Sequence, residues 1–281
     1  MADLDNLHIS VRQGDPTILF LHGLAGHHGE WRPVIGQLDA AIGVIAPDQR
    51  AHGRSFTGAS NEGASIEGTS IEGTSIDVSR DAYVQDAADM IMDLGTDAIV
   101  VGQSMGGVVS TLLAAEAPDL VRHLVLIEAG MDAMTDEDLD GLRNWFDSWP
   151  QPFADRKAAS EFFGADAPST PAWVDGLEKT ADGLMARFDP SQMVDTMRSL
   201  ASKSRHELFA KIEVPITLIR AQDSTISDED VARMLEAQPQ MGVTEIAESG
   251  HDVHLDQPEL VAMAISRIVA EDSSGTDTDD G

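Results

Sequence analysis

Short runs of apolar and β-branched residues alternate with amphipathic stretches along most of this chain. The short runs predict buried strands, and spacings of three and four between apolar positions predict helices. This alternation indicates the α/β class, with a mostly parallel sheet that helices cover on both faces. We expect strands at 17–21, 42–46, 98–101, 124–127, 216–219 and 243–247, and helices at 30–38, 78–94, 105–116, 228–237 and 258–270.

Two regions interrupt the alternation. The first, residues 62–76, reads EGASI-EGTSI-EGTSI. A period of five is far shorter than solenoid repeats, and glycine recurs too often for a helix. We therefore predict a flexible surface loop over 60–77, with a functional lid segment as the alternative.

The second region, residues 131–205, is mostly helical by composition and lacks strand-like runs. It holds eight of the 13 aromatic side chains. We expect most of them to pack a small core and some to roof a pocket. The predicted organisation is a core formed by 1–130 and 206–270, a helical cap at 131–205, and an acidic disordered tail at 271–281.

Charge sharpens this picture. The 49 acidic against 18 basic residues give a formal net charge of −31. Nucleic acids and anionic membrane surfaces need a basic face, so both are poor partners. The 42% hydrophobic content argues against disorder of the whole chain. Acids spread along the chain, with 32 Asp and only four Lys, suggest adaptation to a salt-rich cytoplasm, as in halophiles.

The residue inventory excludes several kinds of chemistry. The chain has no Cys, which rules out disulfides, thiolate zinc sites and cysteine nucleophiles. The N-terminus has neither the basic region nor the apolar stretch of a signal peptide, and no apolar run is long enough to span a membrane. We expect a soluble cytoplasmic protein.

A candidate nucleophile follows the strand predicted at 98–101. Gly102-Gln103-Ser104-Met105-Gly106 has the G-x-S-x-G pattern between a strand and a helix. A reversal this sharp strains the serine backbone, and glycines on either side avoid clashes. The Ser104 hydroxyl should therefore project above the carboxyl end of the sheet.

A serine nucleophile needs a base, and the base needs an orienting acid. His251 follows the strand at 243–247, at the edge where open α/β sheets bind ligands, and His254 is its nearest rival. Asp223 follows the strand at 216–219 and gives the chain order Ser, Asp, His. Glu128, after the strand at 124–127, is the alternative acid, whereas Asp228 is better explained as a helix cap.

Backbone donors complete the predicted site. Gly23 allows a tight turn after the strand at 17–21, which would aim the N–H of Leu24 at a substrate oxygen. The N–H of Met105 would lie beside it at the start of a helix. The pair would form an oxyanion hole, with each donor contributing a few kcal/mol in the transition state. His22 is expected to fix this loop and not to transfer protons.

Together these motifs resemble the α/β-hydrolase superfamily over nearly the whole chain. The resemblance rests on His22-Gly23, the segment Asp48 to Ser55, the elbow Gly102 to Gly107, Asp223 and Gly250-His251. It implies the α/β-hydrolase fold with a helical cap between the sixth and seventh strands. Ala51 departs from the usual glycine, and Gln103 from the commoner His or Trp. The N-terminus has room for one strand, Leu7 to Val11, and at most a stunted hairpin partner.

The resemblance implies a serine hydrolase that cleaves a small, apolar carboxylic ester through an acyl-enzyme, without cofactor or metal. Ser104, His251 and Asp223 would form the triad. The expected partner is a small-molecule apolar acyl substrate. The same triad resembles that of cofactor-free haloperoxidases or perhydrolases, carbon–carbon bond hydrolases, lactonases and thioesterases, so these remain alternatives. A non-catalytic binding protein is disfavoured because each triad member is present.

Overall fold

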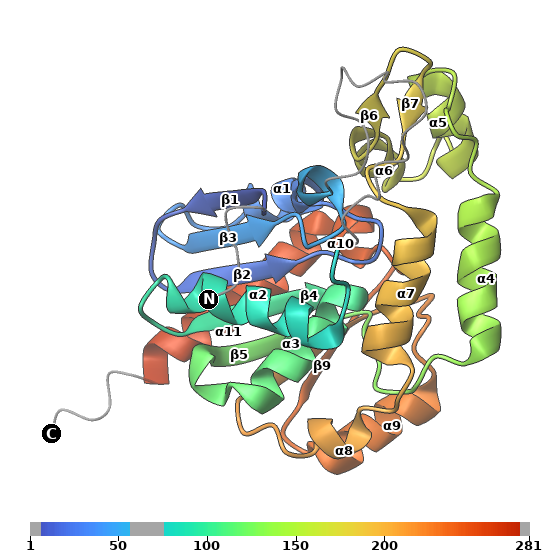
Figure 1. Ribbon diagram of the computed structural model, residues 1–281. Coiled ribbons are helices and arrows are strands. Elements are labelled where there is room, and N and C mark those ends of the chain that lie inside the picture. The colour runs from blue at the N-terminus through green and yellow to red at the C-terminus, as the bar shows by residue number, and fades with distance from the viewer. Residues whose placement is uncertain (1–6, 57–75, 276–281) are drawn as a thin grey trace, which may run out of the picture.

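The computed structural model describes residues 7–56 and 76–275, and a seven-stranded sheet forms its centre (Figure 1). The strand order is β1-β3-β2-β4-β5-β8-β9, with β1 antiparallel to β3 and the other neighbours parallel. The carboxyl ends of the parallel strands therefore meet at one edge. The strands are β1 (Ile9–Arg12), β2 (Thr17–Leu21), β3 (Gly43–Pro47), β4 (Ala98–Gln103), β5 (Val121–Ile127), β8 (Ile216–Ala221) and β9 (Gly242–Ile246).

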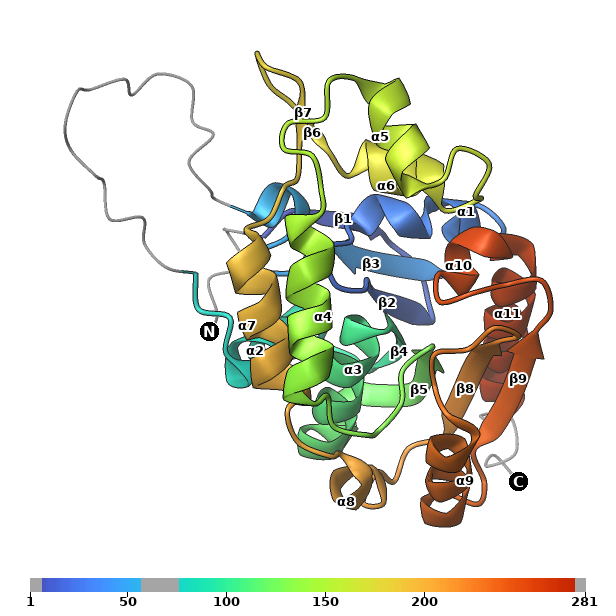
Figure 2. The ribbon, with the colours of Figure 1, turned by 90° about the vertical axis from the view of Figure 1, so that its right-hand side faces the viewer.

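Helices cover both faces of the sheet, because side chains alternate in direction along each buried strand. Leu19 and Leu21 of β2 face one apolar cluster, whereas Ile18 and Phe20 face the other. The first cluster packs α2 (Arg80–Met92), α3 (Met105–Glu116), α8 (His206–Phe209) and α9 (Asp228–Ala237); the second packs α1 (Arg32–Ile35), α10 (Val253–Asp256) and α11 (Pro258–Gly275) (Figures 1 and 2).

Three of the five predicted helices have different bounds. Helix α2 begins two residues later and ends two residues earlier than the expected 78–94. The helix expected at 30–38 is a 3-10 turn, η2 (His28–Trp31), followed by the one-turn α1. Pro33 lies in the first turn of α1, and Gly36 follows its last residue. Helix α11 runs to Gly275 and so includes the first five residues of the predicted tail. Among the described residues, no helix is long and apolar enough to cross a membrane.

The sequence repeat at 62–76 lies outside the described residues except for Ile76. Residues 276–281 of the predicted tail lie outside them as well.

The segment predicted as the cap forms a layer beyond the carboxyl edge of the sheet (Figure 1). It comprises α4 (Asp136–Asp147), α5 (Arg156–Phe163), α6 (Thr170–Asp175) and α7 (Pro190–Ala201). The prediction of no strands here was wrong by one small hairpin, β6 (Glu178–Lys179) with β7 (Leu184–Met185). Strands of two residues are too short to leave an alternating pattern.

Aromatic side chains pack the interior of this cap. Phe146 lies 5.8 Å from Trp149 and 5.2 Å from Phe188 between ring centroids, and Trp149 lies 4.9 Å from Phe163. These distances are typical of favourable edge-to-face contacts. The aromatic residues concentrated at 131–205 thus form a cluster of their own.

The two ends of the cap segment are fastened together, and we call this junction the cap root. The backbone N–H of Arg205 donates to the Met131 carbonyl at 2.8 Å. The buried Arg205 guanidinium donates to the carbonyls of Gly130 (3.1 Å) and Asp132 (2.7 Å). The Asp230 carboxylate accepts the N–H groups of Met131 (2.8 Å) and Asp132 (3.2 Å).

Candidate active site

Ser104 occupies a strained turn between β4 and α3. Its φ of 50° and ψ of −114° lie where residues other than glycine rarely occur. The strained turn is stabilised by the hydrogen bond from the Ser104 N–H to the Ile127 carbonyl at 2.9 Å and by close packing of the flanking chain. A Cβ at Gly102 would lie 2.3 Å from the Ser110 hydroxyl, and one at Gly106 would lie 2.2 Å from the Leu21 carbonyl oxygen. Strain of this kind gathers at functional sites.

His251 lies opposite Ser104, after β9. Its Nδ1 is 3.1 Å from the Thr225 hydroxyl and 3.6 Å from Glu128 Oε2. The Thr225 hydroxyl also lies 3.2 Å from the same carboxylate oxygen. Thr225 thus bridges the imidazole and the carboxylate. Because the Glu128 oxygen can only accept, the Thr225 hydroxyl donates to Glu128 and accepts from His251 Nδ1.

Glu128 follows β5 with a positive φ of 48°, and its side chain is buried. Burial alone would raise the pKa of this carboxyl. The contact with His251, the N–H groups of Ala221 and Thr225 and the Ser224 hydroxyl outweigh burial, so its pKa lies below the ordinary value. A buried, ionised carboxylate therefore stands behind the imidazole.

A cavity of about 580 Å³ opens between Ser104 and the cap. Its walls are mostly apolar. The indole N–H of Trp173 donates to Asp252 at 3.0 Å, which ties the cap to the loop that carries His251. The lining residues include Leu24, Gln103, Ser104, Met134, Leu142, Trp145, Phe162, Phe163, Trp173, Met197 and His251.

A second, more polar hollow of about 320 Å³ lies on the cap-root side. Ser104 and His251 line this hollow as well as the first. Within the described parts of the chain, no hydrogen bond joins the Ser104 hydroxyl to the imidazole. Such bonds are often loose without substrate and tighten in the complex.

Leu24 and Met105 flank the serine. Met105 is the first residue of α3, so its N–H has no partner within the helix. Leu24 follows Gly23, where a Cβ would lie 2.0 Å from Gln103 Oε1. Gln103 in turn donates from Nε2 to the His251 carbonyl at 3.1 Å. Gln103 therefore links the loop after β2 to the loop that carries the imidazole.

A model of the alpha/beta hydrolase family matches residues 18–264 of this chain. The chain belongs to the alpha/beta hydrolase family. It is 26% identical to the 2-(acetamidomethylene)succinate hydrolase of Mesorhizobium japonicum over 278 residues, which cover 95% of this chain and 94% of that protein. It is 28% identical to an esterase of Mycobacterium tuberculosis over 256 residues, or 86% of this chain and 79% of the esterase.

A solved structure agrees with these relatives. The crystal structure of E-2-(acetamidomethylene)succinate hydrolase superposes with a TM-score of 0.76 at 25% identity, covering 95% of this chain and 97% of that one. The predicted α/β-hydrolase fold and enzyme class are confirmed, because the relatives are named hydrolases and esterases.

The hydrolase places one predicted triad member elsewhere. The Asp223 carboxylate is exposed and, among the described residues, has no hydrogen-bond or ion-pair partner. Only its backbone N–H is engaged, with the Ser249 carbonyl at 3.1 Å. The structure therefore brings His251 together with Glu128, the alternative acid, and not with Asp223. Sequence reasoning missed Thr225 because it belongs to no recognisable motif. It missed the link through Gln103 because the elbow pattern does not specify the residue at that position.

The bridge through Thr225 makes a prediction. Thr225→Val keeps the shape of the side chain but removes the hydroxyl between His251 and Glu128. We expect kcat for ester hydrolysis to fall about tenfold, the value of one hydrogen bond to a charged group. Thr225→Ser should retain most of the activity. Steady-state kinetics of both variants check this, and equal rates for Val and Ser would contradict the bridging role.

Two buried histidines below the site make stability depend on pH. His22 Nδ1 lies 2.7 Å from the Gly23 carbonyl, and Nε2 accepts the Gln49 N–H at 2.9 Å. Burial lowers the pKa of His22 to about 3 and that of His52 to about 4. Both stay neutral in the folded hydrolase, whereas in the unfolded chain they protonate near the ordinary pKa of about 6.5.

The unfolded state therefore binds more protons between pH 4 and 6.5, so stability should fall as the pH drops through this range. The expected slope is up to about 1.4 kcal/mol per pH unit for each histidine. Urea unfolding at fixed salt measures it. His52→Gln should reduce the slope by one proton, and an unchanged slope would refute the assignment.

Two groups in the described part of the hydrolase have the spacing of metal ligands. They are His8, His28 and Asp48, and Asp132, His206 and Asp230. Neither group includes Ser104 or His251. The second group is engaged at the cap root, where Arg233 pairs with Asp132 and His206 Nε2 lies 2.8 Å from Asp230.

Proposed function

We propose that this hydrolase cleaves a small, largely apolar carboxylic ester through an acyl-enzyme on Ser104. His251 would act as the base, and Glu128 would orient it through Thr225. One observation carries the proposal: a serine in a strained elbow and an imidazole anchored to a buried carboxylate line the same cavity. A serine beside a base that a third group orients is the arrangement that activates a hydroxyl nucleophile.

The residues fit a two-step reaction. His251 takes the proton of the Ser104 hydroxyl while the oxygen attacks the carbonyl carbon. The N–H groups of Leu24 and Met105 would stabilise the oxyanion that forms. As the tetrahedral species collapses, the imidazolium gives its proton to the departing alcohol. A water molecule then attacks the acyl-enzyme, His251 takes its proton, and the acid leaves as Ser104 is reprotonated.

Substrate class follows from the walls of the cavity. The larger hollow is lined by Leu142, Trp145 and Phe163 and by other apolar cap residues, so an apolar acyl or alcohol group would lose water there favourably. Relatives named as an esterase and as a substituted succinate hydrolase agree with acyl-bond chemistry. An aliphatic or aryl ester is the substrate that these walls favour.

Labelling with a fluorophosphonate tests the proposal. The reagent should modify Ser104 stoichiometrically, because only an activated serine attacks it. The reaction belongs in molar KCl, in keeping with the proposed adaptation to salt, with circular dichroism to show that the protein is folded. Ser104→Ala supplies the matched control. A folded wild-type protein that stays unlabelled would exclude the serine mechanism.

A further inference from the structure

A small cavity away from Ser104 joins the cap to the core. Its volume is about 170 Å³. Arg32 reaches it from the start of α1 and Arg54 from the 3-10 turn Gly53–Ser55 after β3, whereas Arg187 reaches it from the cap segment before α7. The remaining lining residues are His27, His28, Asp48, Gly53, Asp175 and Gly176.

The three arginines have no ion-pair or hydrogen-bond partner for their guanidinium groups within residues 7–56 and 76–275. Nε of Arg187 is buried and unpartnered. Basic residues are scarce in this chain, 18 against 49 acids, so pairing should be easy. Several other arginines follow that expectation, such as Arg50 with Asp86 at 2.6 Å and Arg122 with Asp97 at 2.6 Å.

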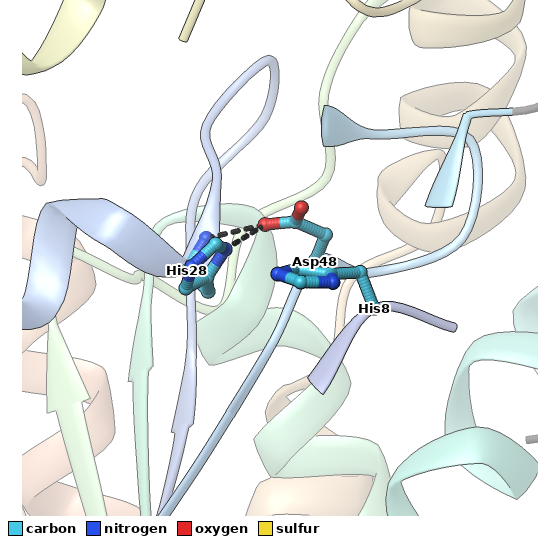
Figure 3. A group of neighbouring side chains, drawn as sticks. All are labelled: His8, His28 and Asp48. Atoms are coloured by element: carbon cyan, nitrogen blue, oxygen red, sulfur yellow. Dashed lines mark hydrogen bonds and ion pairs between the residues drawn. The ribbon is translucent and has the colours of Figure 1, made fainter. Parts of the chain in front are cut away.

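The acids that line the cavity do not neutralise it. Asp175 pairs with Arg156 at 2.6 Å. Both oxygens of the buried Asp48 carboxylate are occupied: one accepts the His28 N–H and lies 2.7 Å from its Nδ1, and the other accepts the Arg54 N–H at 2.8 Å (Figure 3). With Arg156 added to the three lining arginines, four arginines stand against Asp48 and Asp175, so the surroundings of the cavity carry a net positive charge.

The positive charge around the cavity favours an anion over a cation as its ligand. His8, His28 and Asp48 have metal-ligand spacing and face one another (Figure 3). Arg54 and Arg187 line the same cavity as His28 and Asp48. Burial lowers the pKa of His8, the Asp48 carboxylate raises it, and the positive charges of Arg54 and Arg187 lower it. A divalent cation would be repelled there, whereas guanidinium groups bind oxyanions in bidentate fashion.

We propose that this cavity binds a small dianionic oxyanion of the phosphate type, which fastens the cap to the core. The anion would satisfy donors of Arg32 and Arg54 on one side and of Arg187 on the other. It would add to the existing link between the parts, in which His27 Nε2 lies 3.1 Å from the Ala172 carbonyl. Because α6 also carries Trp173, the anion would steady one wall of the catalytic cavity.

Titration with inorganic phosphate tests the proposal. In KCl of constant ionic strength, calorimetry and the ³¹P linewidth should show saturable binding to the full-length protein. Arg54→Gln and Arg187→Gln should each weaken that binding about tenfold or more, since each removes hydrogen bonds to a charged group. Arg143→Gln, an exposed arginine of α4 far from this cavity in the chain, removes the same charge and should bind as the wild type.

Phosphate also stabilises proteins non-specifically by exclusion from their surface, an effect that does not saturate and is the same in every variant. A rise in melting temperature that is linear in phosphate and equal in all four proteins would overturn the site. Hydrogen exchange of α6 that slows with phosphate in the wild type, but not in Arg187→Gln, would support the fastening. Saturable binding with unchanged exchange would refute it.

Discussion

Replacing Ser104 with Ala should lower kcat for ester hydrolysis by about 10⁴- to 10⁶-fold, with little change in KM. Only the Oγ atom disappears, and the backbone of the elbow is held by the Ile127 carbonyl and by its neighbouring glycines. Residual activity would come from the N–H groups of Leu24 and Met105 acting on a water molecule. Kinetics under conditions of proven folding measure the effect.

The comparison needs a matched control, because the drop must come from the nucleophile and not from a damaged helix. Ser148→Ala removes a hydroxyl that also lines the larger cavity but lies in the cap. It should leave kcat within a few-fold of the wild type. If Ser104→Ala kept most of the activity while the labelled serine lay elsewhere, the proposed mechanism would be lost.

Replacing Glu128 with Gln should lower kcat by about 10³- to 10⁴-fold. A neutral amide can no longer stabilise the imidazolium that forms on His251, and its NH₂ group would face donors that now point at a carboxylate oxygen. That mismatch should also destabilise the fold by about 1–3 kcal/mol. Activity is therefore measured under conditions in which the variant is folded. A urea titration gives its free energy of unfolding.

Asp223→Asn is the decisive partner of this variant. It makes the same change of carboxylate to amide on an exposed side chain after the neighbouring strand, so kcat should barely change. A large loss in Asp223→Asn together with a small one in Glu128→Gln would reverse the assignment and restore the acid expected from the sequence.

Much of the fold is encoded locally. Strand β2 and helices α3 and α9 have the predicted bounds, because each is a single apolar or amphipathic run between clear breakers. The elbow is equally local, since two glycines and a serine between strand and helix have few other arrangements. Ala51 lies at φ 63°, which explains why the related motif usually has glycine there.

Which acidic residue lies beside His251 is not encoded by the local sequence. Glu128 and Asp223 both follow the carboxyl ends of adjacent strands, β5 and β8, so their positions in the sequence are equivalent. The backbone at Glu128, with φ 48°, directs its side chain inward to donors of Ala221, Ser224 and Thr225 at and after the end of β8. Pattern and spacing carry no information about that direction, and the long bridges through Thr225 and Gln103 are hidden for the same reason.

The cap root begins only two positions after Glu128. Asp230 and Arg205 hold the backbone from Gly130 to Asp132, and a Cβ at Gly130 would lie 2.3 Å from Asp230 Oδ2. The short segment 128–132 thus carries the Glu128 carboxylate and connects the core to the cap. If the cap swings about Gly130 to admit substrate, the same rotation disturbs the support of His251. Substrate entry and catalysis then take place at different times, because Glu128 supports His251 only while the cap is closed.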